Sequence, residues 1–171
     1  MPAASKRLSV LSSALICLLL LSCDKQPKVI SDFESILLRN INPESGGVEV
    51  RIDSDNDVIV RFVEKRADGL FEIRYKSSIS HQERISLVET INNAGFFGLQ
   101  SSSGDAPVAG EPSPFISIKS QAANGIVWRW DSERDQAFNA LYLRLLEIAE
   151  SAKQGKILYR GPYNPMSKLE R

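Results

Sequence analysis

The stretch 48–76, VEVRIDSDNDVIVRFVEKRADGLFEIRYK, decides the fold of this chain. From Val48 to Ile52 every second residue is apolar and the residues between are charged, and the period of two returns at Val58 to Phe62 and at Phe71 to Tyr75. This period is typical of strands that bury one face and leave the other in water. Turn-forming residues separate the three runs, and Asp68-Gly69 is the clearest of these turns. The stretch therefore predicts three antiparallel strands.

The segments on either side of this stretch predict a further strand and a helix. Ser35 to Ile41 is rich in apolar residues and fits a strand or one helical turn, of which we favour the strand. Pro43 to Gly47 then breaks the chain. Ser80 and Glu83 have the spacing of a capping box, so a helix is expected to begin there and to end at Gly95.

The C-terminal third predicts a hairpin followed by a second helix. Phe115 to Gln121 and Ile126 to Trp130 flank Asn124-Gly125, a pair that tolerates positive φ and therefore predicts the hairpin turn. Asp131 or Ser132 is expected to cap the last helix. Apolar residues at helical spacing mark its buried stripe, namely Phe138, Leu141, Leu145, Ile148 and Ala152.

The order strands, helix, hairpin, helix predicts an α+β fold, with an antiparallel sheet of about five strands and two helices packed on one face. We assign residues 32–154 to a single domain. Residues 155–171 are expected to form a polar C-terminal tail, with a short strand as an option at Ile157 to Tyr159.

The N-terminus has the order of residue types found in an export signal. Lys6 and Arg7 precede the apolar run Leu8 to Leu21, which is too short for a membrane span. Leu20-Leu21-Ser22-Cys23 resembles the lipobox of bacterial lipoproteins. The resemblance implies that residues 1–22 are a signal peptide and that Cys23 becomes the lipid-bearing N-terminus.

The residues that follow Cys23 indicate where in the cell the protein is located. Asp24 resembles the signal that retains lipoproteins in the inner membrane of enteric bacteria, which implies the periplasmic face of the inner membrane if the source is Gram-negative. Residues 23–31 are polar and are expected to be a tether. Cys17 is the only other cysteine and lies in the signal, so a disulfide or a thiolate metal site is not expected in the mature chain.

The mature region weakly resembles a family of small uncharacterised exported bacterial lipoproteins. The resemblance spans Val48 to Ser151 and rests on the Asp68-Gly69 turn, Ile79-Ser80 before a charged helix, the helix exit Asn93 to Leu99, Asp105, and a hairpin that leads into a leucine-rich helix. Because this family has no established activity, the resemblance implies none for this chain. The chain has 21 basic and 21 acidic residues, a balance that does not favour nucleic acid as a partner.

The residues show no catalytic constellation, so we expect neither an enzyme nor a cofactor. His81 is the only histidine, and its place at a helix start favours an exposed side chain. Asp53, Asp55 and Asp57 alternate as in a calcium loop, but Val58 stands where such a loop needs glycine. They are a weak metal candidate, and an acidic hairpin turn is the favoured interpretation.

Two features are candidate partner-binding elements. The loop Gln100 to Pro114 is long for a compact domain, which fits a partner-docking loop and an idle disordered excursion equally well. If it docks a partner, the candidate contacts are its residues Asp105, Pro107, Glu111 and Pro112. Ile126, Trp128 and Trp130 share a strand face that fits a binding platform, although we favour a place in the core.

The expected function is a non-catalytic protein-interaction module, bound to the membrane through the lipid on Cys23 and to a protein partner in the envelope. Its partner would contact the loop or the polar sheet face with Glu49, Arg51, Glu72 and Arg74. The alternative is a carrier or sensor of a small molecule or ion. An enclosed apolar pocket would favour the carrier, and a filled core the module.

Overall fold

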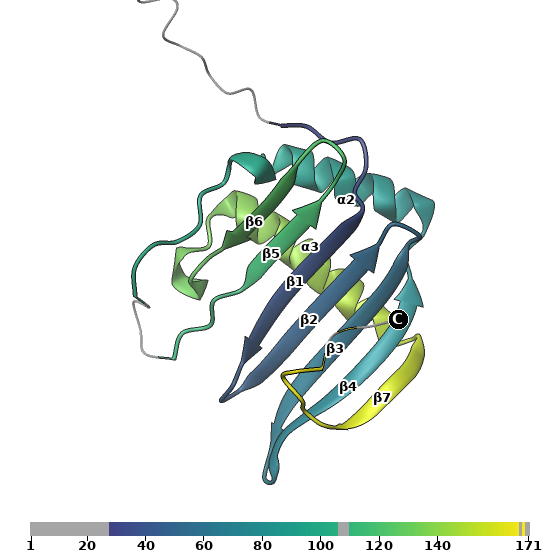
Figure 1. Cartoon of the computed structure of the whole chain (residues 1–171), viewed down its shortest axis with the longest axis vertical. Coiled ribbons are helices and arrows are strands. Elements are labelled where there is room, and N and C mark those ends of the chain that lie inside the picture. Colours follow the sequence, from purple (N-terminus) through teal and green to yellow (C-terminus); the bar gives the residue numbers. More distant parts are fainter. Residues whose placement is uncertain (1–27, 106–109, 168, 170–171) are drawn as a thin grey trace, which may run out of the picture.

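The computed structural model describes residues 28–105, 110–167 and 169. They form one antiparallel sheet of seven strands, in the order β6-β5-β1-β2-β3-β4-β7, with α2 and α3 together on one face (Figure 1). The strands are β1 (Ser35–Asn42), β2 (Gly46–Asp53), β3 (Asp57–Arg66), β4 (Gly69–Ser78), β5 (Phe115–Lys119), β6 (Asn124–Trp128) and β7 (Lys156–Pro162). The helices are α2 (His81–Asn93) and α3 (Gln136–Ala152), with short 3-10 helices η1 (Phe96–Gly98) and η2 (Asp131–Glu133).

The prediction of about five strands is wrong, because the sheet has seven. The seventh, β7, lies in the segment expected to be a polar tail and pairs with β4 along the edge of the sheet. The short strand given as an option at Ile157 to Tyr159 lies in the first half of this longer one. Most of β7 is exposed on both faces, so its sequence lacks the apolar alternation that marks the central strands.

Both helices begin with a side-chain cap. Ser80 and Glu83 form the predicted capping box: the Glu83 N–H donates to the Ser80 hydroxyl, and the Ser80 N–H donates to the Glu83 carboxylate. The cap predicted for α3 is wrong. Asp131 and Ser132 belong to η2, and Asp135 is the N-cap, accepting a 2.8 Å hydrogen bond from the Phe138 N–H.

The hairpin between β5 and β6 turns earlier than predicted. Its turn is Ser120 to Ala123, closed by the Ser120 N–H and hydroxyl on the Ala123 carbonyl. Asn124 and Gly125 lie inside β6 instead. A Cβ at Gly125 would come within 3.0 to 3.1 Å of the Phe97 and Phe96 rings, so this glycine lets η1 pack closely on the sheet.

The core lies between the sheet and the two helices. Ile36, Leu38, Val50, Leu141 and Leu145 are among its fully buried residues. Val127 is the residue of β6 that enters the core, whereas Ile126 is 68% exposed and Trp128 is half-buried. The expectation that Ile126 and Trp128 are core residues is therefore wrong, because the alternation of β6 places both on the face opposite the helices.

Candidate interaction surface

The sheet face opposite the helices, which we call the outer face, carries a row of charged residues across its central strands. The register sets Glu49 of β2 opposite Arg61 of β3, and Arg61 opposite Arg74 of β4. Glu72 lies two residues before Arg74 on the same face. Residues that alternate with the buried apolar positions are thus brought together by strand pairing.

Arg61 is the centre of this charged row. Its guanidinium lies 3.1 Å from a Glu49 oxygen and 3.2 Å from a Glu72 oxygen, and it is almost fully buried, as is Glu72. Arg74 forms a second, 2.5 Å ion pair with the other oxygen of Glu72. Burying a charge costs several kcal/mol unless it is paired and hydrogen-bonded, and each of these charges has an opposite charge beside it.

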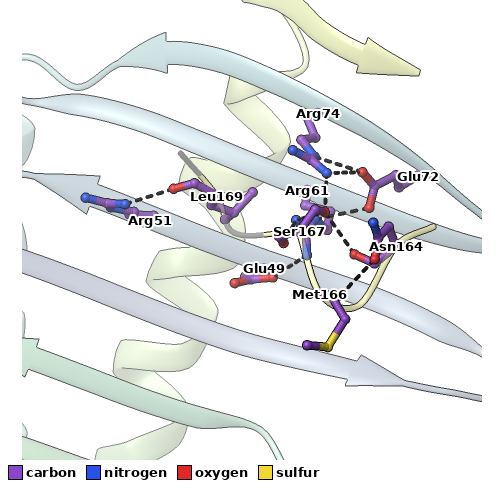
Figure 2. Close-up of polar contacts among 9 residues, drawn as sticks. All are labelled: Glu49, Arg51, Arg61, Glu72, Arg74, Asn164, Met166, Ser167 and Leu169. Carbon is purple, nitrogen blue, oxygen red and sulfur yellow. Dashed lines mark hydrogen bonds and ion pairs between the residues drawn. The ribbon is translucent and has the colours of Figure 1, made fainter. Parts of the chain in front are cut away.

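The C-terminal segment of the chain covers this row. We call Tyr163–Ser167 together with Leu169 the strap (Figure 2). Arg61 donates to the main-chain carbonyl of Ser167 at 2.5 Å and to its hydroxyl at 3.0 Å, and Arg51 donates to the carbonyl of Leu169 at 2.8 Å. The strap therefore supplies hydrogen-bond acceptors to two arginines from the central strands.

The expectation that this half of the sheet is a water-exposed polar face is wrong. Glu49 and Glu72 are buried, and the Leu169 side chain is only 4% exposed. Burial raises the pKa of Glu49 above its ordinary value, although Arg61, Arg39 and Arg74 act in the opposite direction. Sequence reasoning missed Arg61 and the strap. A single charged residue within the apolar run Val58 to Val63 was the available signal.

The other half of the outer face, over β1, β5 and β6, is less covered. Leu37, Phe115 and Trp128 are partly exposed there, beside the strongly exposed Ile126. We call these four residues the open patch. Strand register places Leu37 opposite Ser117 and Ser117 opposite Ile126, while Phe115 lies opposite Trp128.

A pocket of about 280 Å³ lies where the open patch meets the strap. Leu37 and Arg39 line it from the sheet, and Pro165 and Met166 line it from the strap. Met166 is strongly exposed. The pocket thus combines apolar side chains with guanidinium donors at the boundary between the two halves of the face.

The structure describes three of the four loop residues predicted as candidate contacts. Asp105 is exposed, and Pro107 lies outside the described residues. The Glu111 carboxylate accepts a 2.6 Å hydrogen bond from the Ser132 N–H, and the Pro112 carbonyl accepts one from the Asp131 N–H. Glu111 and Pro112 therefore hold η2 against the loop.

The weak metal candidate consists of three aspartates at the β2–β3 turn. The Asp53 carboxylate pairs with Arg51 at 2.9 Å, and that of Asp57 pairs with Lys76 at 2.7 Å. Among the described residues no group of three or more His, Cys, Asp or Glu side chains is arranged to hold a metal ion. His81 is the exposed first residue of α2.

Arg84 ties the beginning of the domain to this same end of the sheet. Its guanidinium pairs with Asp32 at 2.7 Å, donates to the carbonyls of Asp53 and Phe33, and lies over the Phe33 ring. The N–H and the carbonyl of Ile30 both bond to the Asn92 side chain, and Ile30 is buried. Ile30 therefore packs against α2 although it lies within the segment 23–31 predicted to be a tether.

The comparisons with known proteins do not assign the chain to a family. No protein-family model matches it, and no curated protein does. Within the described residues, no helix has the length and apolar character needed to cross a membrane. The predicted signal peptide 1–22, Cys23 and Asp24 lie outside the described residues.

Proposed function

We propose that this protein is a lipid-anchored, non-catalytic interaction module of the cell envelope, which binds a polypeptide segment of a protein partner on the open patch. The lipid is carried by Cys23, and Asp24 assigns the anchor to the periplasmic face of the inner membrane if the source is Gram-negative. The observation that supports the binding role is the strap, because it is a polypeptide segment already seated on the outer face.

The contacts of the strap indicate how a second segment can bind beside it. Arg51 and Arg61 donate to main-chain carbonyls, which every polypeptide has, and Leu169 supplies a buried apolar side chain. Guanidinium donors beside an apolar surface suit a polypeptide that lies along a sheet.

The open patch offers the same combination. Arg39 lies opposite both Glu49 and Phe115 in the strand register, and it lines the 280 Å³ pocket with Leu37. Arg39 forms no ion pair within 4 Å with the described residues, although its charge lowers the pKa of Glu49. In this proposal its guanidinium also binds carbonyl or carboxylate oxygens of a partner. Asp105 lies three residues after Ser102, whose N–H bonds to the Trp128 carbonyl, and we include it as the rim of this surface.

Other features favour a module over the alternative carrier. Side chains from both helices and the sheet fill the core. Three pockets lined by described residues, of about 530, 310 and 280 Å³, are depressions open to solvent and have both polar and apolar linings. A small-molecule carrier normally encloses most of the surface of its ligand.

Site-specific photocrosslinking tests the proposal. A benzophenone amino acid is placed at Ile126 in the full-length chain, and the same probe at Leu143 of α3 is the matched control because Leu143 is also exposed, at 48%. We expect a discrete adduct from position 126 in intact cells and none from position 143. Mass spectrometry should map the adduct to one segment of one protein.

A second variant separates binding from folding. Leu37→Asp puts a charge in the open patch and should remove most of the adduct from position 126 while the melting temperature changes little, because Leu37 is partly exposed. Equal labelling at positions 126 and 143, or an adduct that Leu37→Asp leaves unchanged in a folded protein, would refute the proposed binding surface.

A further inference from the structure

We propose that the free edge of β7 is a second docking site, at which an acidic strand from a protein partner adds to the sheet. This inference rests on β7 alone. It depends neither on lipid attachment at Cys23 nor on binding to the open patch.

The two edges of the sheet differ in how they are covered. At β6, the N–H of Ser102 bonds to the Trp128 carbonyl, and the Ser101 hydroxyl accepts from the Trp128 N–H. At β7, one side of the strand pairs with β4, and none of the described elements lies along the other side (Figure 1). An edge strand without a neighbour presents main-chain donors and acceptors to which another strand can bond.

The side chains of β7 suit a protein partner. Ile157, Leu158 and Tyr159 are 46%, 39% and 38% exposed, which is unusual for three consecutive large apolar residues. Leu158 is the extra residue of a bulge, since Tyr159 pairs with Arg74 and Ile157 with Tyr75. Pairing with β4 continues on both sides of the bulge, so β7 keeps the length needed to receive a short strand.

The charges of β7 identify the kind of partner. Lys156 and Arg160 flank the three apolar residues, and neither forms an ion pair with a described residue. On the neighbouring strand β4, Lys76 and Arg74 are already paired with Asp57 and Glu72, so the unpaired positive charge of this edge comes from β7 itself. Acidic residues at both ends of an added strand would therefore be attracted, with apolar residues between them to contact Ile157 to Tyr159.

The same charges make a second copy of this chain a poor occupant. Pairing of two β7 edges would bring two lysines and two arginines together, and like charges on facing strands are destabilising. Basic residues and a bulge also protect an edge against unwanted pairing. Edge protection alone predicts that β7 rejects every strand, whereas a docking edge discriminates by charge.

Two peptides distinguish these outcomes. The acidic peptide SEVVES and its basic counterpart SKVVKS, both acetylated and amidated, are titrated into the isotope-labelled full chain and followed by NMR. The charged residues of each peptide are three apart because the bulge places Lys156 and Arg160 on opposite faces of β7. We expect the acidic peptide to shift the amide signals of residues 156–161 in a saturable way that weakens with added salt, and the basic peptide to leave them unchanged. No shift on β7 by either peptide, or equal shifts by both, would overturn the proposal.

Charge reversal provides the matched test. Lys156→Glu together with Arg160→Glu should weaken binding of the acidic peptide by about tenfold and allow the basic peptide to bind. The control pair Lys65→Glu and Lys119→Glu makes the same change in net charge at exposed positions outside β7 and should leave both titrations unchanged. An equal loss in the control pair would show a response to net charge alone and would also overturn the proposal.

Discussion

Arg61 and Glu72 lie 3.2 Å apart on the outer face of the sheet, with side chains only 2% and 0% exposed. The strap covers them, so two ionised groups that normally stay in water are sealed between strands and the chain's own C-terminal segment. The buried charges of Arg61 and Glu72 are stabilised by their pairing with each other and by the further contacts of Arg61 with Glu49 and Ser167.

Removal of Glu72 should therefore be costly. Glu72→Ala leaves Arg61 and Arg74 without their shared partner, and the loss of one member of a buried ion pair typically costs about 3 to 5 kcal/mol. Urea denaturation measures the free energy of unfolding. Glu64→Ala is the control, because the Glu64–Arg66 pair is exposed and should contribute less than about 1 kcal/mol. Equal losses in the two variants would contradict the burial of the pair.

The pH dependence of stability should report the burial of Glu49. Its pKa is raised in the folded protein by burial, so the folded state holds this proton more tightly than the unfolded state. The corresponding stabilisation is present below the ordinary pKa of 4.5 and is lost as pH rises through the raised value. Denaturation across this range should show a smaller loss with rising pH in Glu49→Gln than in the parent protein. A larger loss of stability with rising pH in Glu49→Gln than in the parent protein would contradict the raised pKa of Glu49.

The capping box gives the opposite pH dependence. The Ser80 backbone N–H and hydroxyl lower the pKa of Glu83, so its stabilisation is present above 4.5 and is lost as pH falls through the lowered value. Glu83→Gln should flatten the fall in stability at acidic pH while retaining an acceptor for the Ser80 N–H. Thermal melting between neutral and acidic pH checks this, and an unchanged acid limb would show that the carboxylate charge is unimportant.

Helix α3 should contribute strongly through its buried stripe. Leu145 is fully buried, so Leu145→Ala should cost about 2 to 5 kcal/mol through lost burial and the cavity that remains. Leu143→Ala, on the exposed side of the same helix, should cost less than about 0.5 kcal/mol. Denaturant titration of both variants checks the packing, and a loss below about 0.5 kcal/mol for Leu145→Ala would contradict it.

Lipid attachment should require the thiol of Cys23. Cys23→Ser should leave an uncleaved precursor and abolish labelling by a palmitate analogue, because the lipid is joined through sulfur. Labelling and mobility in gels check this outcome in a lipoprotein-processing bacterium. Unchanged labelling of the variant would exclude the lipoprotein assignment and would leave the proposals about the outer face and β7 standing.

Shortening of the loop Gln100 to Pro114 should leave the domain folded. Replacement of residues 103–109 by three glycines and serines retains Ser101, Ser102 and Glu111, which make the contacts with β6 and η2. We expect little change in melting, because loop closure depends weakly on length. The adduct from position 126 should decrease, because the replacement removes Asp105 from the rim of the binding surface. An undiminished adduct would exclude Asp105 from it.

The central part of the fold could be predicted from local pattern alone. The alternation in 48–76 identified β2, β3 and β4, and the Ser80–Glu83 spacing identified the start of α2, since both signals depend only on residues close in sequence. The Asn124-Gly125 turn failed because packing overrode local preference. A Cβ at position 125 would crowd the rings of Phe96 and Phe97, and Ser120 closes the turn instead.

The sequence by itself determined the alternating strands, the capped helix and the lipobox-like N-terminus, because each is written in neighbouring residues. Only the tertiary structure decided that β7 forms one edge of the sheet and that the strap returns across the outer face. Arg61 and Ser167 are 106 positions apart, and nothing local in either segment encodes their contact. The pattern of each strand alone predicts that its charged positions are exposed to water. They are buried because a distant segment supplies the hydrogen bonds that water would otherwise provide.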